Sequence, residues 1–163
     1  MTIDSPRNPA VVAALRLRRS RHRKATGRTL LEGPHLLREA VAGGASIDRV
    51  FATADTDPGA FGFPAPGPVW DVVSERVLER IAPTEHPRGP VAVVRIPSLP
   101  APRAEPSVVL WRSSDPGNAG SVLRRAGACG RPGGVVPGTV DLWGRKGLRA
   151  AAGGRVGARL ARL

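Results

Sequence analysis

The sequence predicts an α/β fold of alternating strands and helices. Short apolar runs, which are typical of buried strands, alternate with segments whose apolar residues recur at helical spacing. Glycine and proline, 20 and 17 of the 163 residues, gather between these segments and mark turns. Hydrophobic residues make up 41% of the chain but aromatic residues only 4%, so the predicted core is aliphatic.

The first predicted element is a helix from Ala10 to Lys24. Its apolar residues lie on one side, as in a helix packed on a core: Val11, Val12, Ala14 and Leu15. Its second half is densely basic and places His22 among Arg16, Arg18, Arg19, Arg21, Arg23 and Lys24. Such a run is either a solvated helix face or a surface that contacts a nucleic-acid backbone. We favour phosphate contact, because no acidic residue between Arg7 and Arg28 offsets the charge.

A strand, a helix and a second strand are predicted next. The apolar run Thr29–Leu31 predicts the first strand. Pro34 suits the first position of a helix, where its missing N–H has no partner to lose. Gly43 and Gly44 are the expected end of that helix, and residues 47–52 predict the following strand.

The next stretch completes a first folding unit. Residues 55–68, rich in Pro, Gly and Ala, predict a loop, and residues 69–73 predict a strand. Ser74 is the expected cap of a helix that Pro83 ends, and residues 90–96 predict a buried strand. Together these elements predict a small α/β sandwich of about 95 residues.

A proline-rich segment, residues 98–106, is the expected linker between two units, because proline favours an extended chain. It separates residues 1–97 from a second unit, residues 107–163. In that unit the apolar runs at residues 108–111 and 133–136 predict two strands.

A turn and a helix follow the first of these strands. Asp115-Pro116-Gly117 predicts the turn, since proline cannot continue a ladder and glycine tolerates positive φ. Asn118 is the expected N-cap of the helix, and Arg124 is expected on its second turn. A guanidinium there can bind a phosphate or a ribose hydroxyl. The alternative is an ordinary strand–helix turn with a surface arginine.

The net charge of +12 is unevenly distributed along the chain. Residues 1–38 carry nine basic and two acidic side chains (+7), residues 39–104 six and eight (−2), and residues 105–163 ten and three (+7). Two basic ends suit a polyanion, and nucleic acid is the expected partner. An arginine-rich composition also arises from a GC-rich genome, so charge alone does not decide the matter.

Composition also argues against several classes of protein. The single cysteine, Cys129, excludes an internal disulfide and a Cys-rich zinc site, and it fits a reducing compartment. No run of about 18 apolar residues predicts a membrane span, and no apolar segment follows the N-terminal charges as in a secretory signal. No histidine has partners at metal-ligand spacing. We therefore expect a cytoplasmic protein without a metal site or a membrane partner.

The segment Asn118-Ala119-Gly120-Ser121-Val122-Leu123-Arg124-Arg125-Ala126 resembles the first motif of the SpoU/TrmH family of RNA ribose 2′-O-methyltransferases. The resemblance implies that Asn118 and Arg124 belong to the active site. Arg124 would activate or orient the ribose 2′-hydroxyl with the help of an RNA phosphate, and Asn118 would order the site near the reacting ribose. It also implies S-adenosylmethionine as methyl donor, rRNA or tRNA as substrate, and a homodimer.

Two further segments, residues 31–40 and 84–93, resemble the domain that precedes many SpoU-type catalytic domains. This resemblance implies an RNA substrate-binding domain, similar in fold to certain ribosomal proteins, and it adds Arg38 to the expected RNA contacts. The two histidines, His35 and His86, are expected to be structural or RNA-contacting rather than catalytic. Glu32 and Glu85 are expected to be cap or turn residues rather than general bases.

Residues 139–153 resemble a later block of the family, in which Lys146 and Arg149 match and are expected RNA contacts. Gly144-Arg145 replaces an Asn-Pro pair of the family, and Ala151 replaces its serine. The family's donor-binding motifs, which form a deep trefoil knot, have no counterpart here. The second unit is therefore expected to be an incomplete α/β knot domain of the SPOUT type, ending in either a short basic helix from Arg155 or a tail of translated GC-rich sequence.

Three functions remain open on this basis. The chain is an RNA 2′-O-methyltransferase by resemblance, with RNA binding retained. The alternatives are a non-catalytic RNA-binding module and a truncated gene remnant.

Overall fold

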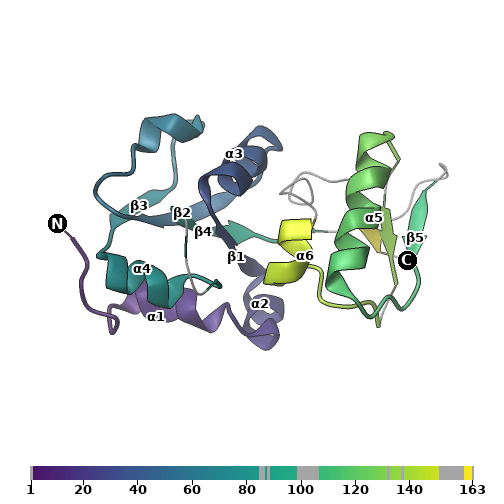
Figure 1. Cartoon of the computed structure of the whole chain (residues 1–163), viewed down its shortest axis with the longest axis horizontal. Helices are drawn as coiled ribbons and strands as arrows, with labels where there is room; N and C mark the ends of the chain where they lie inside the picture. Colours follow the sequence, from purple (N-terminus) through teal and green to yellow (C-terminus); the bar gives the residue numbers. More distant parts are fainter. Residues whose placement is uncertain are drawn as a thin grey trace.

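Two β-sheets organise the chain (Figure 1). The computed structural model describes residues 2–84, 87, 89–98, 107–131, 133–136, 138–150 and 160–162. The first sheet has the strand order β1-β4-β2-β3 and comprises β1 (Arg28–Glu32), β2 (Ile47–Ala52), β3 (Val69–Val72) and β4 (Val91–Arg95). The second sheet is parallel, with the order β5 (Val108–Leu110), β6 (Gly133–Val135) and β7 (Leu160–Arg162). The predicted α/β class is confirmed.

The first sheet is covered on both faces and forms the predicted sandwich. Helices α1 (Pro9–Arg16) and α4 (Glu75–Ile81) pack on one face, and α3 (Pro34–Ala42) with the 3-10 helix η1 (Pro58–Phe61) on the other (Figure 1). Successive strand residues point to opposite faces. Leu30, Phe51, Val91 and Val93 join the core under α1 and α4, whereas Leu31, Val50, Ala92 and Val94 join the core under α3.

Most predicted boundaries in this unit agree with the structure. Helix α3 begins at Pro34 and has Gly43 as its C-cap, followed by Gly44 at φ 73°. Ser74 precedes α4 as its N-cap, but its hydroxyl bonds Asp4 at 2.7 Å rather than the helix backbone. Glu32 accepts hydrogen bonds from the backbone N–H (3.2 Å) and hydroxyl (2.5 Å) of Thr84, so it stabilises a turn as expected.

The predicted helix from Ala10 to Lys24 is wrong in its continuity. The structure has two helices there, α1 and α2 (Ser20–Thr26), with a break at residues 17–19. The Nη1 group of Arg23 donates to the carbonyl oxygens of Leu17 (2.8 Å) and Arg18 (2.9 Å). Carbonyls at the end of a helix lack intrahelical partners, and these bonds satisfy two of them where the chain bends.

The second unit is smaller. Its helices are α5 (Pro116–Ala128) and α6 (Arg145–Ala150), and its buried core consists of Leu110, Ala119, Leu123 and Leu142. The predicted strands at 108–111 and 133–136 are confirmed to within a residue, although Trp111 lies just beyond β5 and is 74% exposed. The helix considered from Arg155 onwards is not what residues 160–162 form, since they are strand β7.

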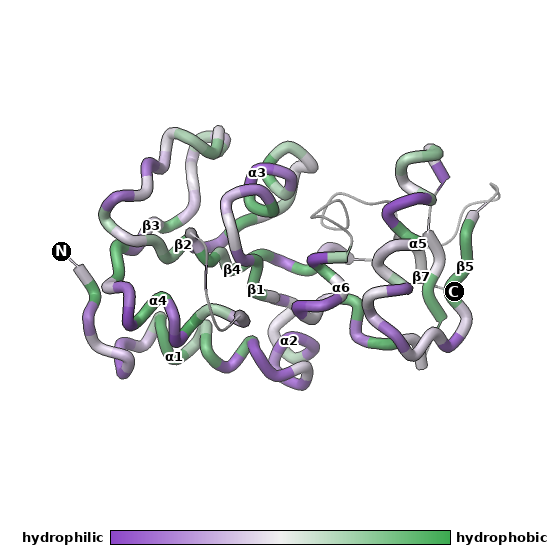
Figure 2. The backbone as a smooth tube through the Cα atoms, in the orientation of Figure 1, coloured by the Kyte–Doolittle hydropathy of each residue, from purple (hydrophilic) through white to green (hydrophobic). Residues whose placement is uncertain are grey.

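Helix α6 lies between the sandwich and α5 (Figure 1) and contacts both α5 and β1. Its Leu148 is 2% exposed and belongs to the core under α3, and the nearby Trp143 packs against that core and against the core of the second unit. Figure 2 shows that α2 and α6 are mostly hydrophilic. Their buried residues are Arg23 in α2 and Gly147 and Leu148 in α6. We call this region, residues 141–148 with the residues they contact on α2 and β1, the junction.

Several predicted features lie outside the described residues. These are Glu85 and His86, residues 99–106 of the expected linker, and residues 151–159 of the C-terminal segment. Among the helices that are described, none is long and apolar enough to cross a membrane.

Candidate functional site

The segment that carries the first family motif is helix α5. Asp115 is its N-cap, and the Asp115 Oδ1 atom accepts a hydrogen bond from the N–H of Asn118 at 2.6 Å. The expectation that Asn118 caps the helix is therefore wrong. Asp-Pro is itself a helix-start signal, because aspartate caps well and proline suits the first helical position. The helix begins three residues earlier than expected, and Arg124 lies on its third turn.

Asn118 and Arg124 are both exposed, on the side of α5 away from its buried residues Ala119, Leu123 and Ala126. Six residues of helix separate them by about 9 Å along the axis and about 120° around it. The backbone thus places the two side chains on the solvent-facing side of α5, but they do not point directly at each other. A flexible arginine can reach along such a surface toward a group bound beside Asn118.

The start of α5 adjoins the end of β5 and a returning loop. Arg112, directly before this turn, has φ 45°, a left-handed conformation that costs a non-glycine residue about 1 kcal/mol. The N–H of Val140 donates to the Ser113 carbonyl at 2.9 Å, and the Thr139 hydroxyl donates to the Leu110 carbonyl at 3.1 Å. These bonds hold residues 139–140 beside the strand end, so the two family blocks of the second unit lie together.

The junction is held by a set of partly buried polar contacts. Arg23 of α2 forms an ion pair with Asp141 through its Nη2 group. The other Asp141 oxygen accepts from the N–H of Trp143 at 3.0 Å, and the Trp143 carbonyl accepts from the Thr29 hydroxyl at 2.7 Å. Burial alone would raise the pKa of Asp141, but hydrogen bonds from Ser20 and Arg23 and the charge of Arg23 outweigh it and lower that pKa. The carboxylate is therefore ionised at neutral pH.

The predicted basic residues fall into two groups that meet at this junction. On α1, α2 and the break between them, five side chains are exposed: Arg16, Arg18, Arg19, Arg21 and Lys24. On α6, Lys146 and Arg149 are exposed, as is Arg145. Partial burial, together with the charges of Arg21, Arg16 and Arg19, lowers the pKa of His22 below its ordinary 6.5. A strongly positive local field accounts for the charge part of that effect.

Two of the predicted RNA contacts lie elsewhere. Arg23 is 9% exposed and its guanidinium binds Leu17, Arg18 and Asp141, so it is an interior structural residue rather than part of a phosphate-contacting surface. Arg38 lies on α3, on the opposite face of the sheet from α1, with its guanidinium 5.6 Å from the ring centroid of Phe61.

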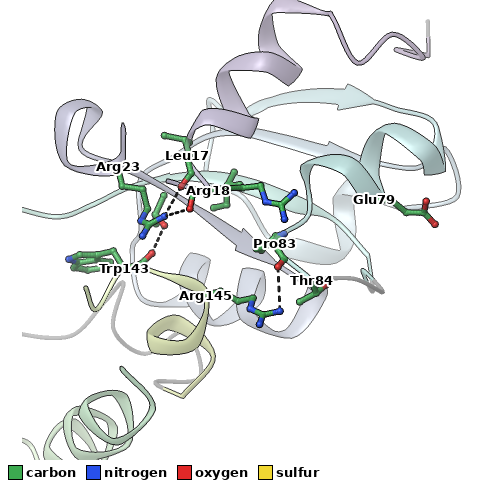
Figure 3. A pocket seen from close by; sticks show the side chains of 10 residues that line it. Leu17, Arg18, Arg23, Glu79, Pro83, Thr84, Trp143 and Arg145 are labelled. Carbon is green, nitrogen blue, oxygen red and sulfur yellow. Dashed lines mark hydrogen bonds between the residues drawn. The ribbon is translucent and has the colours of Figure 1, made fainter. Parts of the chain in front are cut away.

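A cavity of about 570 Å³ opens at the junction (Figure 3). It is lined by both units: Leu17, Arg18, Arg23, Thr29, Leu30, Glu79, Pro83, Thr84, Trp143 and Arg145. Sequence reasoning did not single out Arg145, which was only noted as a departure from the family's Asn-Pro pair. No local pattern marks it, because its place in the cavity depends on contacts between residues far apart in the chain.

The acidic side chains that the structure describes in the second unit already accept hydrogen bonds. Among the described residues of the second unit the acidic side chains are Asp115 and Asp141, and each is already bound, to the α5 backbone and to Arg23. The part of the chain that the structure covers also holds no cluster of three or more His, Cys, Asp or Glu side chains suited to a metal ion.

Comparison with known proteins agrees with this architecture. The family of MRM3-like substrate-binding domains matches residues 8–92, which is more than half of the chain. The chain belongs to the SpoU/TrmH family. An uncharacterized tRNA/rRNA methyltransferase of Synechocystis sp. is 36% identical over 160 residues, covering 93% of this chain and 58% of that protein.

Two further SpoU/TrmH relatives show the same partial coverage. The 23S rRNA (guanosine(2553)-2′-O)-methyltransferase RlmP of Bacillus subtilis is 28% identical over 155 residues, covering 93% of this chain and 60% of RlmP. The crystal structure of an AdoMet-bound rRNA methyltransferase from Sinorhizobium meliloti superposes with a TM-score of 0.85 at 27% identity, covering 99% of this chain and 64% of that one. The chain thus spans about three-fifths of the length of the curated relatives it matches.

Proposed function

We propose that this chain binds rRNA or tRNA as a SpoU/TrmH-family RNA ribose 2′-O-methyltransferase. The observation that carries the proposal is the meeting of two basic groups, Arg16–Lys24 and Arg145–Arg149, at the junction between the substrate-binding domain and the unit with the catalytic motif. Phosphate contacts by exposed arginine and lysine supply most of the affinity for a nucleic-acid backbone without reading its sequence.

In this proposal Arg124 and Asn118 act at the reacting ribose. The guanidinium of Arg124 orients the 2′-hydroxyl and, with an adjacent RNA phosphate, favours its deprotonation. The amide of Asn118, at the first turn of α5, orders the same site. Both side chains are exposed, which leaves them accessible to a bound RNA. The proposed domain organisation is residues 1–97 for RNA binding, 98–106 as linker and 107–163 for the catalytic motif.

S-adenosylmethionine supplies the methyl group in this family. A second candidate function is RNA binding without methyl transfer, which is favoured because the acidic side chains described in the second unit, Asp115 and Asp141, already accept hydrogen bonds from the α5 backbone and from Arg23. We also propose a homodimer and a cytoplasmic location, in keeping with the family resemblance and the single cysteine.

Three measurements on the 163-residue chain test the proposal: RNA binding, isothermal titration with S-adenosylmethionine, and transfer of a labelled methyl group to total rRNA and tRNA. Together they separate the two functions. Methyl transfer that Arg124→Ala abolishes, while Arg125→Ala on the same helix leaves it intact, supports the enzyme. RNA binding with no donor binding supports the non-catalytic module. Failure to bind any RNA at low salt contradicts both.

A further inference from the structure

The junction cavity has the chemistry of an anion site. Three arginines from two distant parts of the chain line it, Arg18, Arg23 and Arg145, against one carboxylate, Glu79. Figure 3 shows Glu79 pointing away from Arg18 and Arg145, which lie on either side of Pro83. Arg23 is neutralised by Asp141, so Arg18 and Arg145 remain as the cations that dominate the cavity.

These two arginines are pre-positioned with most of their donors unused. The Arg18 Nη1 group donates to the Arg80 carbonyl at 3.3 Å, and the Arg145 Nη1 group donates to the Pro83 carbonyl at 3.4 Å. Within the described residues each guanidinium makes this one long hydrogen bond. A guanidinium has five N–H donors in a planar fork that suits phosphate oxygens. Both guanidinia are therefore tethered near the end of α4, one within its last turn and one just after it, while keeping donors for a ligand.

A buried donor without a partner belongs to one of the residues that line this cavity. The Arg23 side chain is 10% exposed, and its buried Nε–H group has no hydrogen-bond partner among the described residues. An unsatisfied buried donor costs about 1–3 kcal/mol. Arg23 is one of the residues that line the cavity, so the unmet donor and the two free cations occur together.

We propose that the junction cavity binds a phosphodiester of the RNA backbone, held between Arg18 and Arg145. The proposal rests on the proposed RNA-binding function and names a subsite for it. The cavity volume of about 570 Å³ is ample for one nucleotide unit. Because one of the arginines comes from the substrate-binding domain and the other from the start of α6, a phosphate seated there bridges the two units and fixes the RNA relative to α5.

The test compares RNA binding by matched double variants of the 163-residue chain. Arg18→Ala with Arg145→Ala removes the cavity cations; Arg7→Ala with Arg131→Ala removes the same charge from exposed residues outside the cavity. The probe is a fluorescent single-stranded RNA, titrated at several salt concentrations. For single strands, each lost phosphate contact lowers the slope of log K against log salt by about 0.7. We expect the cavity variant to bind about tenfold more weakly with a slope reduced by this amount, and the control variant to keep the wild-type slope.

A second arm reports occupancy of the cavity directly. Trp143 lines the cavity, and Trp70→Phe with Trp111→Phe leaves it as the sole tryptophan. Its fluorescence should change as RNA binds, and Arg18→Lys with Arg145→Lys should keep the salt slope because the charges remain. Inorganic phosphate, as a competitor, should displace RNA only at far higher concentration.

The outcomes separate the two claims. If the wild-type chain binds no RNA, the proposed function fails and the subsite with it. If the wild type binds RNA but the cavity variant binds with the same affinity and slope as the control, only the subsite is overturned. A Trp143 signal that responds to phosphate but not to RNA overturns the subsite as well, since the cavity would then be a small-anion site. Circular dichroism on each variant verifies that the fold is intact.

Discussion

The two units of this chain both combine strands and helices, but they differ in the size of their buried hydrophobic cores. The sandwich has strands of four to six residues with a buried core on each face, including Phe51, Leu31 and Leu37 at 1% exposure or less. The described part of the second unit has strands of three residues and one small core. It also leaves Trp111, Val109 and Val122 exposed at 74%, 44% and 40%.

This difference indicates that the second unit depends on the first. Small cores bury too little apolar surface to offset the entropy of folding. Contacts at the junction add stability to the second unit, because Leu148 packs in the core under α3 and Arg23 pairs with Asp141. The same junction joins the basic groups proposed to bind RNA, so stability and function meet in one place. Four predictions test or sharpen this comparison.

The largest effect is expected from core truncation. Phe51 is fully buried, and Phe51→Ala should cost about 3–5 kcal/mol of unfolding free energy and destabilise both units together. Leu123→Ala, at a residue 4% exposed in the second core, should remove amide protection from α5 while leaving the β1–β4 protection intact. Urea denaturation with hydrogen exchange measures both. If Leu123→Ala reduced amide protection equally in both units, the claim that the second unit depends on the sandwich but not the reverse would be contradicted.

A smaller loss of stability is expected at Gly147, where α6 lies very close to the backbone of Leu142. A Cβ atom added there would overlap the carbonyl of Leu142, so Gly147→Ala should cost about 1–3 kcal/mol through forced backbone movement. Gly127→Ala on α5 is the matched control, because nothing lies within 4 Å of its added Cβ and alanine favours a helix. We expect thermal melting to show destabilisation by the first substitution and slight stabilisation by the second.

Breaking the ion pair between Arg23 and Asp141 should reduce stability by no more than Gly147→Ala does. Asp141→Asn removes the charge that compensates the buried Arg23 and should cost about 1–3 kcal/mol, chiefly in the protection of α6. Asp55→Asn makes the same chemical change at an exposed loop residue and should leave protection within about 0.5 kcal/mol of wild type. A loss confined to the sandwich interior would show that the pair does not couple the units.

The smallest effect concerns acid stability. Asp48, which bonds Arg28 and Arg95 in the sandwich, and Asp141 at the junction both have pKa values below the ordinary 3.8, because arginine hydrogen bonds outweigh the opposing effect of burial. A carboxyl with a lowered folded pKa stabilises the fold above 3.8, and that contribution disappears as pH falls from 3.8 through the folded value. In denaturant titrations below pH 4, Asp48→Asn should flatten the pH dependence of the sandwich and Asp141→Asn that of the junction. Unchanged slopes in both variants would contradict the assignment.

The sandwich was readable from sequence because its signals are local. The apolar runs within residues 28–32 and 91–95, Pro34 at a helix start and Gly43-Gly44 at its end all depend on neighbours in the chain. The break between α1 and α2 was not readable, since neither proline nor glycine marks it. It depends on Arg23, whose bonds to Leu17 and Arg18 require the folded arrangement of α2.

In the candidate site, too, local features were predicted from the sequence and long-range contacts were not. The motif resemblance selected Asn118 and Arg124, and Asp115-Pro116 carried a helix-start signal that was available but assigned to a turn. The pair of Arg23 with Asp141 joins residues 118 positions apart, and the placement of Arg145 at the cavity follows from it. Such contacts are set by the packing of whole elements, which spacing in the sequence does not encode.

The most direct test of the account is hydrogen exchange on the 163-residue chain with and without a single-stranded RNA. If one RNA spans the junction, the backbone amides of α2 and of α6 should both gain protection in the same complex, and α5 should gain some near Asn118. Protection confined to α2, with α6 unchanged, would contradict the central claim that the two basic groups form one RNA-binding surface.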